Sequence, residues 1–263
     1  MTGSARRWHW RSGSKSTDNL RALMADRALI VNADDFGLSP GVNAGVARTH
    51  EQGILTSASL MVRRAAAGAA AEYAQATPTL GVGLHVDLGE WARSDGVWRA
   101  VYEVVPPDDA GAVEAEVRAQ LDRFRKLIGR DPTHLDSHQH VHKWEPATGV
   151  LAHLAAELGV PLRERLGGVR YCGDLYGHDE FGKPIPEAIT PRALIEIISK
   201  LEPGVTELAC HPGIGADTGT AYDSEREREV EVLCDPGVVE VLEREGVRLR
   251  SFAGIVSNKS APR

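Results

Sequence analysis

The sequence predicts an α/β protein with a (β/α)-barrel-like fold, an irregular TIM-type barrel of about seven parallel strands. Short, continuous apolar runs alternate with longer segments of helical periodicity, the pattern of βα units whose strands are buried on both faces. Polar residues follow several of the apolar runs directly, as expected where the carboxyl ends of parallel strands form a site. The number of runs favours a closed or nearly closed barrel, and a doubly wound open sheet is the alternative.

Each expected strand is a short apolar run, and the runs are Ala28–Asn32, Ala58–Val62, Gly81–Val86, Thr133–Ser137, Val160–Arg163, Glu207–Ala209 and Val247–Phe252. Ser39 is a predicted N-cap with Pro40 at the first helical position, and Gly129 is predicted to end the longest helix. Helices are expected from Pro40 to near Gly53 and over Ala65–Ala76, Val113–Ile128, Pro146–Leu158, Pro191–Leu201 and Gly237–Glu245.

Two segments interrupt the alternation, Gly89–Asp109 and Leu166–Glu187. Both carry Gly, Pro, Trp or Tyr, so we expect long loops that shape a substrate cleft. Residues 1–24 are rich in Ser, Gly and Arg with little apolar periodicity, and they are predicted to form a flexible tail. Residues 25–263 are then expected to form a single catalytic domain.

Composition excludes several classes of protein. The 263 residues include 30 basic and 37 acidic side chains, a net charge of −7, so the basic surface that nucleic acid requires is not expected. No apolar run approaches the roughly 20 residues that span a bilayer, so no membrane partner is expected either. The three cysteines are widely separated, which argues against a disulfide framework and fits a reducing cytoplasm. A homodimer is compatible with the sequence.

Four clusters of polar residues follow predicted strands, and they are Asp34-Asp35, His85-Val86-Asp87, Ser137–His142 and His211-Pro212-Gly213. Each has a structural explanation when taken alone: aspartates stabilise turns, single histidines are often hydrogen-bonded structural residues, and alternating histidines can lie on an exposed strand. Four unrelated structural roles would not be expected to place polar residues at the same end of successive strands. Their recurrence therefore favours one shared site.

A carboxylate and two imidazoles with open coordination positions are a common catalytic metal site. A second carboxylate could act as general base on a metal-bound water, and a histidine on the opposite side could protonate the leaving group. The pattern predicts metal-assisted hydrolysis. Zinc, magnesium, manganese, cobalt and nickel are all compatible with one aspartate and two histidines.

Five segments resemble the YdjC-like carbohydrate deacetylases, a family that includes the chito-oligosaccharide deacetylases. They are Ile30–Ser39 (IVNADDFGLS), Gly53–Val62, Gly81–Leu88, Pro132–His142 (PTHLDSHQHVH) and Glu207–Gly213 (ELACHPG). The resemblance runs in the family's order from about Arg27 to Ser251. It implies a (β/α)-barrel-like fold and one divalent ion, magnesium or zinc. The implied reaction removes the N-acetyl group of an acetylated amino sugar, a chito-oligosaccharide or related glycoconjugate, and releases acetate.

The resemblance also implies roles for individual residues. Asp35, His85 and His138 would be the metal ligands. Asp34 would be the base that activates the metal-bound water, and His211 the acid or transition-state stabiliser.

Further residues would support these five. His140 and His142 would contact the substrate or the ligands, Asp136 would orient an imidazole, and Arg163 would hold an acidic neighbour or a substrate oxygen. Gln139 stands where the family commonly has a third consecutive histidine, so the resemblance does not identify which sugar is the substrate. In the predicted loop over Leu166–Glu187, a set of aromatic and polar residues could bind sugar or lie on a solvated surface: Tyr171, Tyr176, His178, Asp179 and Phe181.

Two other functions remain as alternatives. A barrel hydrolase or isomerase of phosphate esters or of other small amides or esters uses similar ligands, although no Gly-rich phosphate loop is present. A non-catalytic sugar- or metal-binding module would need neither a base nor an open metal position.

Overall fold

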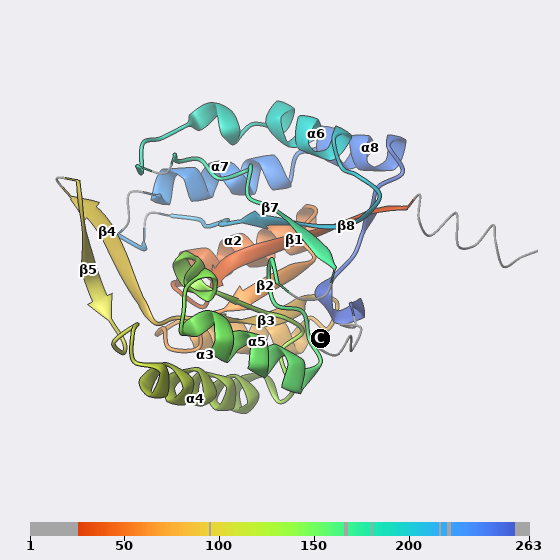
Figure 1. Cartoon of the computed structure of the whole chain (residues 1–263). Coiled ribbons are helices and arrows are strands. Elements are labelled where there is room, and N and C mark those ends of the chain that lie inside the picture. Colours follow the sequence, from red (N-terminus) through yellow and green to blue (C-terminus); the bar gives the residue numbers. More distant parts are fainter. Residues whose placement is uncertain are drawn as a thin grey trace, which may run out of the picture.

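A single parallel sheet surrounded by helices forms the body of the protein in a computed structural model (Figure 1). The structure describes residues 26–94, 96–165, 168–179, 181–215, 217–219 and 222–255, so the tail predicted for residues 1–24 lies outside the described residues. Hydrogen-bonded strands follow the order β6-β3-β2-β1-β8-β7, with β9 beside β1. The strands are β1 (Arg27–Phe36), β2 (Ser57–Leu60), β3 (Gly81–Val86), β6 (Leu135–Ser137), β7 (Val169–Cys172), β8 (Gly204–Cys210) and β9 (Arg248–Leu249).

The central strand β1 is buried almost throughout, which explains its continuous apolar sequence. It pairs in parallel with β8 from Arg27 opposite Gly204 to Ala33 opposite Cys210, and with β2 on its other side. All strand pairs in this sheet are parallel, so their carboxyl ends lie at the same end of the sheet. The predicted (β/α)-barrel-like fold is confirmed.

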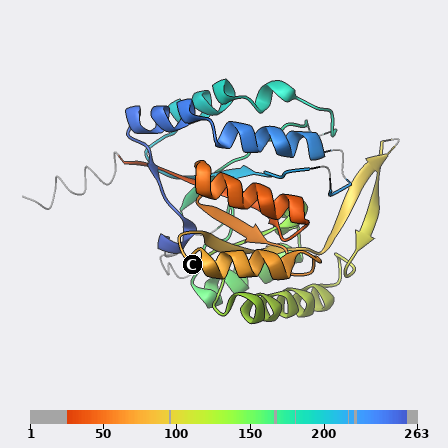
Figure 2. The ribbon, with the colours of Figure 1, turned by 180° about the vertical axis from the view of Figure 1, so that it is seen from behind.

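Helices cover both sides of the curled sheet, as the view from behind shows (Figure 2). They are α2 (Pro40–Gln52), α3 (Ala67–Ala76), α4 (Ala110–Ile128), α5 (Ala147–Leu158), α6 (Pro191–Ser199), α7 (Asp223–Leu233) and α8 (Pro236–Arg244), with short 3₁₀ turns at His138–Lys143, Pro186–Ala188 and Phe252–Gly254. Ser39 caps α2 by accepting a hydrogen bond from the Val42 amide, as predicted. Gly129 ends α4 with a φ of 80°, a left-handed conformation that glycine adopts without strain. Among the described residues, no helix is long and apolar enough to cross a membrane.

The barrel is irregular at one side. The predicted strand over Val160–Arg163 contributes only a single bridge, between Leu162 and Leu135, next to β6. A strand that was not predicted, β7, completes the path beside β8. Because β7 is short and only half-buried, with an exposed Arg170, its sequence lacks the continuous apolar run by which the other strands were recognised.

The segment Gly89–Asp109 was expected to be a loop, and this prediction is wrong for most of its length. It forms an antiparallel hairpin of β4 (Gly89–Ser94) and β5 (Val97–Glu103) that extends from the end of the barrel where β3 ends (Figure 1). Nearly all of β5 is exposed, so its apolar residues do not show the pattern of a buried strand.

No element was predicted between Gly213 and Pro236, where the structure contains helix α7. Its sequence, DSEREREVEVL, is dominated by charges and resembles a solvated surface segment. Yet Glu225, Arg226 and Glu229 are buried in it. Two of them, Arg226 and Glu229, contact residues of the site described next.

Candidate metal centre and catalytic cavity

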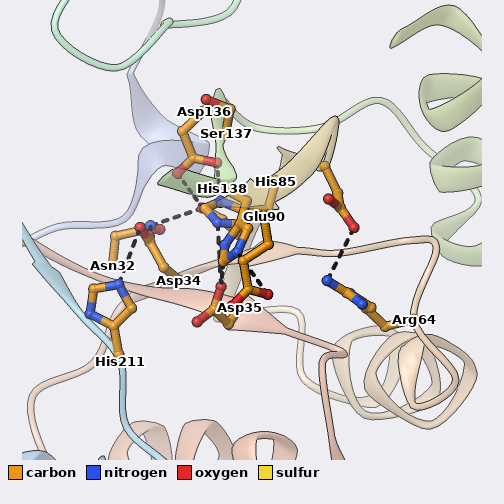
Figure 3. Close-up of polar contacts among 12 residues, drawn as sticks. Asn32, Asp34, Asp35, Arg64, His85, Glu90, Asp136, Ser137, His138 and His211 are labelled. Carbon is orange, nitrogen blue, oxygen red and sulfur yellow. Dashed lines mark hydrogen bonds and ion pairs between the residues drawn. The ribbon is translucent and has the colours of Figure 1, made fainter. Parts of the chain in front are cut away.

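Side chains from the carboxyl ends of four predicted strands converge on one cavity of about 390 Å³ (Figure 3). The predicted members that line it are Asp34, Asp35, His85, His138, His140 and His211. They lie at, or shortly after, the carboxyl ends of β1, β3, β6 and β8, which are parallel, so the fold itself brings them together.

The candidate metal ligands form a compact group. Oδ1 of Asp35 lies 3.5 Å from Nε2 of His85 and 3.2 Å from Nδ1 of His138. Asp35 has a φ of 63°, an uncommon conformation for a residue other than glycine. Nε2 of His138 is buried without a hydrogen-bond partner. One carboxylate and two imidazoles, all within 4.8 Å of one another, are a suitable donor set for a divalent cation.

Electrostatics support this choice of site. Burial lowers the pKa of His85, but the carboxylates of Asp136 and Asp34 outweigh burial and raise that pKa to about 10. Burial also lowers the pKa of His138, and its hydrogen bond to Asp35 helps raise that pKa to about 9. Two protonated imidazoles then face Asp35. A bound cation would replace these protons with positive charge in the same place.

Asp136, which was expected to orient an imidazole, is hydrogen-bonded to His85. Its Oδ1 accepts a hydrogen bond from Nδ1 of His85 at 2.8 Å, which leaves Nε2 directed toward Asp35. Its Oδ2 accepts a hydrogen bond from the Ser59 hydroxyl at 2.7 Å and pairs with Arg163 at 2.8 Å. Because every oxygen of Asp136 is engaged in this way, the group of Asp34, His85 and Asp136 is a poorer candidate for metal binding.

Arg163 is buried among three carboxylates. It donates to both oxygens of Asp34, each at 2.7 Å, and pairs with Glu207 at 2.6 Å as well as with Asp136. Arg163 thus pairs with acidic neighbours, which is one of the two contacts expected for it. Burial alone would raise the pKa of Asp34, yet the Arg163 guanidinium outweighs it and holds that pKa below its ordinary value. Asp34 is therefore an ionised, fixed carboxylate at neutral pH.

His211 lies on the Asp34 side of the cavity, with its Nε2 3.9 Å from Oδ2 of Asp34. Burial lowers the pKa of His211 to about 4, so its imidazole is neutral near pH 7. Its Nδ1 is buried without a hydrogen-bond partner. His211 therefore lies where the acid or stabilising group was expected, and its imidazole is neutral before the reaction.

The remaining predicted histidines separate in the structure. His140 lines the cavity, with its Nε2 3.3 Å from the Tyr171 hydroxyl. His142 is fully buried outside the cavity lining, where its Nδ1 lies 2.7 Å from the Ser137 hydroxyl. The HxHxH run is a 3₁₀ turn with positive φ at Gln139 and His140, so alternate histidines do not share a face as they would in a strand.

The segment Leu166–Glu187 supplies aromatic residues to the site. Tyr171 and Tyr176 line the cavity, and Tyr176 stacks on Tyr222 with ring centroids 4.6 Å apart. Asp179 instead accepts hydrogen bonds from the backbone amides of Phe181 and Lys183, which stabilise a turn. His178 is 3.5 Å from a carboxylate oxygen of Glu225.

Sequence reasoning missed the contribution of α7. Arg226 donates to Oδ2 of Asp35 at 2.7 Å, and Glu229 accepts hydrogen bonds from the His211 amide and, at 2.6 Å, from the Tyr222 hydroxyl. The signal was present in the spacing: Arg226, Glu229, Val230 and Leu233 follow the i, i+3, i+4, i+7 pattern of one helix face. A helix that carries charges on its apolar face is a candidate for burying them at a site. Glu90 of β4, 3.8 Å from His138, was also missed.

Comparison with known proteins agrees with this geometry. The model of the YdjC-like protein family matches residues 28–244. A carbohydrate deacetylase of Geobacillus stearothermophilus is 34% identical over 246 residues, covering 86% of this chain and 97% of the relative. A chitooligosaccharide deacetylase of Salmonella dublin is 32% identical over 259 residues, covering 88% and 100%.

Two solved structures share the fold. The crystal structure of a protein of Enterococcus faecalis described as a cellobiose-phosphate cleavage protein has a TM-score of 0.71 at 27% identity, covering 86% of this chain and 98% of that one. A family 4 carbohydrate esterase of Streptomyces lividans, in complex with acetate, has a TM-score of 0.55 at 13% identity, covering 91% and 100%, and shows likeness of fold alone. From the family match and these relatives, we conclude that the chain belongs to the YdjC-like protein family.

Proposed function

We propose that this chain is a metal-dependent carbohydrate deacetylase that hydrolyses the N-acetyl group of an acetylated amino sugar and releases acetate. One observation carries the proposal: the ionised Asp34 lies in the same cavity as the Asp35, His85 and His138 group. Relatives at 32–34% identity that are named carbohydrate or chitooligosaccharide deacetylases support it.

Asp35, His85 and His138 would hold one divalent cation. Two imidazoles beside one carboxylate favour zinc or another transition metal, whereas magnesium prefers oxygen ligands. When bound, such a cation supplies a Lewis acid that polarises the acetyl carbonyl and lowers the pKa of a nearby water. The rest of the chemistry belongs to the side chains of the chain itself.

Asp34 is the proposed general base. Arg163 holds both of its oxygens, so the carboxylate stays ionised and fixed in orientation as it accepts a proton from the attacking water. The water oxygen bonds to the acetyl carbon, and the bond between that carbon and the sugar nitrogen then breaks.

His211 is the proposed stabilising group on the leaving-group side. Because its pKa lies near 4, it enters the reaction neutral and acts first as a hydrogen-bond donor. The proton released by the water ends on the sugar nitrogen, so that an amine and acetate are formed. Tyr171 and Tyr176 provide aromatic walls against which a sugar ring can lie.

The test is acetate release from N,N′-diacetylchitobiose and a panel of N-acetyl sugars, measured after chelation and after adding back single metals. We expect release that depends on the added metal, with one ion bound per chain. Release that is equally fast in the chelated protein would contradict the metal requirement. A tightly bound metal with no acetate from any sugar would contradict the deacetylase assignment and favour another amide or ester as substrate.

Three further expectations stay proposals. Residues 25–263 would form a single catalytic domain, and the free Cys172, Cys210 and Cys234 support a reducing, cytoplasmic location. A homodimer would be recognised from the mass in solution.

A further inference from the structure

The two histidines of the candidate metal centre face Asp35 through different nitrogens (Figure 3). His85 directs Nε2 toward Oδ1 of Asp35, at 3.5 Å, and donates from Nδ1 to Asp136. His138 directs Nδ1 toward the same oxygen of Asp35, at 3.2 Å, which leaves its Nε2 to face another group. An imidazole that binds a metal offers one nitrogen to the metal and carries its proton on the other. Each histidine therefore needs an acceptor for its second nitrogen.

Glu90 is placed to be that acceptor for His138. One of its carboxylate oxygens lies 3.8 Å from Nε2 of His138, a buried nitrogen without a hydrogen-bond partner among the described residues. Both side chains line the catalytic cavity. The gap exceeds a hydrogen bond of roughly 3 Å by an amount that rotation of the flexible Glu90 side chain can close. Because Glu90 faces the nitrogen that is turned away from Asp35, it is not one of the grouped donor atoms of the candidate metal centre.

The first strand of the hairpin is fixed beside His138 by a pair of hydrogen bonds. Trp91, the residue after Glu90, donates its backbone N–H to the side-chain oxygen of Gln139 at 2.9 Å. The carbonyl of Trp91 accepts from the side-chain nitrogen of Gln139 at 3.0 Å. Gln139 in turn follows His138 directly. Two consecutive residues of the hairpin thus contact two consecutive residues of the 3₁₀ turn, and the place of Glu90 depends on this contact.

The second strand is anchored to the barrel as well. Tyr102 lies opposite Glu90 in the strand register, and its hydroxyl donates to Asp87 at 2.8 Å. The guanidinium of Arg64, which follows β2, packs over the Tyr102 ring at 4.5 Å from its centroid. The base of the hairpin is therefore attached on both strands, so it can hold Glu90 in a fixed place.

We propose that Glu90 is a positioning residue of the metal centre, which accepts the Nε2 proton of His138 and thereby keeps Nδ1 free to bind the metal. Asp136 has the same task at His85, with the two ring nitrogens exchanged. The inference rests on the proposed metal-dependent function. It makes the metal affinity depend on the hairpin, which lies outside the barrel that supplies the ligands themselves.

The experiment measures zinc affinity directly, in the absence of any sugar. Chelated protein competes for zinc with a chromophoric chelator, and Glu90→Gln is compared with the parent. Glutamine has nearly the same size but no charge, and its NH₂ group can donate to Nε2, which favours the wrong tautomer with the proton on Nδ1. We expect the Kd for zinc to rise by about tenfold or more, the range found when an outer partner of a ligating histidine is lost.

A spectroscopic measurement separates positioning from a general loosening of the site. In zinc-loaded protein with ¹⁵N-labelled histidine, NMR should show His138 bound through Nδ1 and His85 through Nε2. The Nε2 proton of His138 should exchange with water faster in Glu90→Gln than in the parent. The Nδ1 proton of His85, which Asp136 holds, should keep its parental exchange rate and serves as the internal reference.

Glu103→Gln is the matched control. Glu103 is the last residue of β5, lies opposite Gly89 in the same hairpin and is exposed. The substitution removes the same charge from the same element without touching His138. Its Kd for zinc should equal that of the parent.

Each outcome decides for or against the proposal. Parental zinc affinity in Glu90→Gln would overturn it, as would binding of His138 to zinc through Nε2. An equal loss of affinity in Glu103→Gln would also overturn it, because the charge of the hairpin and not the contact with His138 would then be responsible. A parent protein that binds zinc but releases no acetate contradicts the deacetylase alone. A parent that binds no divalent cation contradicts both proposals.

Discussion

The catalytic cluster around Arg163, Asp34 and Asp136 is built differently from a neighbouring cavity of about 720 Å³ that is lined by Trp91, Trp98 and Trp144, the tryptophan cavity. Around Arg163, Asp34 and Asp136 every charge is buried and paired, so each side chain depends on its neighbours. In the tryptophan cavity, Trp98 of the β4–β5 hairpin and Trp144, which follows the 3₁₀ turn His138–Lys143, are both exposed. A change in the cluster should therefore affect both catalysis and folding, whereas a change at Trp98 or Trp144 should leave folding nearly unaffected.

The largest effect is expected from Asp34→Asn. Removal of the base should lower kcat about a thousandfold, within the range of general-base catalysis, while the Asp35 group still binds its metal. Activity and metal content per chain should be measured on the same preparation. His138→Ala is the contrasting variant, because it should lose the metal itself. Full activity in Asp34→Asn would show that another group is the base.

Arg226→Gln tests whether α7 stabilises the empty site. The buried Asp35 carboxylate would lose its guanidinium partner, which should cost about 3 kcal/mol of folding stability in the metal-free protein. A bound cation should restore much of this loss, so the rise in melting temperature on adding metal should be larger in the variant than in the parent. Arg228→Gln, at an exposed position of the same helix, is the control. Equal metal-induced shifts in parent and variant would argue against the coupling.

Glu207→Gln tests the buried charges through pH. Burial raises the pKa of Glu207 to about 7 despite its ion pair with Arg163. A carboxyl whose pKa is higher when folded contributes stability below its unfolded pKa and loses that contribution as pH rises through about 7. The glutamine variant cannot ionise, so its stability relative to the parent should rise by up to about 3 kcal/mol between roughly pH 4.5 and pH 8. Urea unfolding of variant and parent should be measured across this range. If Glu207 does not titrate there, the difference between their free energies of unfolding would be the same at every pH.

The smallest effect is expected for the stability of Trp98→Ala. An exposed side chain contributes little to the folded state, so the free energy of unfolding should change by less than about 0.5 kcal/mol. Urea unfolding would measure it. A loss of several kcal/mol would mean that the tryptophan cavity belongs to the core, and the comparison between the two regions would fail.

The parts of the molecule that were predicted from sequence are those in which the apolar residues of a segment are also the residues that the fold buries. β1 is an uninterrupted apolar run that ends in Asp34 and Asp35, and the parallel fold then places those carboxylates beside His85 and His138. Arg163 was singled out as the last residue of the predicted strand Val160–Arg163, although that segment forms only a single bridge.

The parts that escaped prediction obey tertiary rather than local constraints. The charged sequence of α7 has no local reason to be buried; only the carboxylate of Asp35, contributed by a distant strand, explains Arg226. The hairpin displays its apolar residues to solvent, so the periodicity that identifies a packed strand is missing from Trp98 and Val101. His142 was grouped with the site because it matches the family's motif, but the 3₁₀ turn with positive φ angles at Gln139 and His140 leaves it outside the cavity lining.

The two adjacent aspartates point to guanidinium groups from widely separated parts of the chain: Asp34 to Arg163 and Asp35 to Arg226. During synthesis, the strand that carries both carboxylates leaves the ribosome long before either arginine. Until Arg226 has emerged, closing the barrel around this strand would bury the Asp35 carboxylate without its guanidinium partner, which is unfavourable. The order of the chain thus delays completion of the centre until most of the protein has been made, and partly synthesised chains should remain open at this strand.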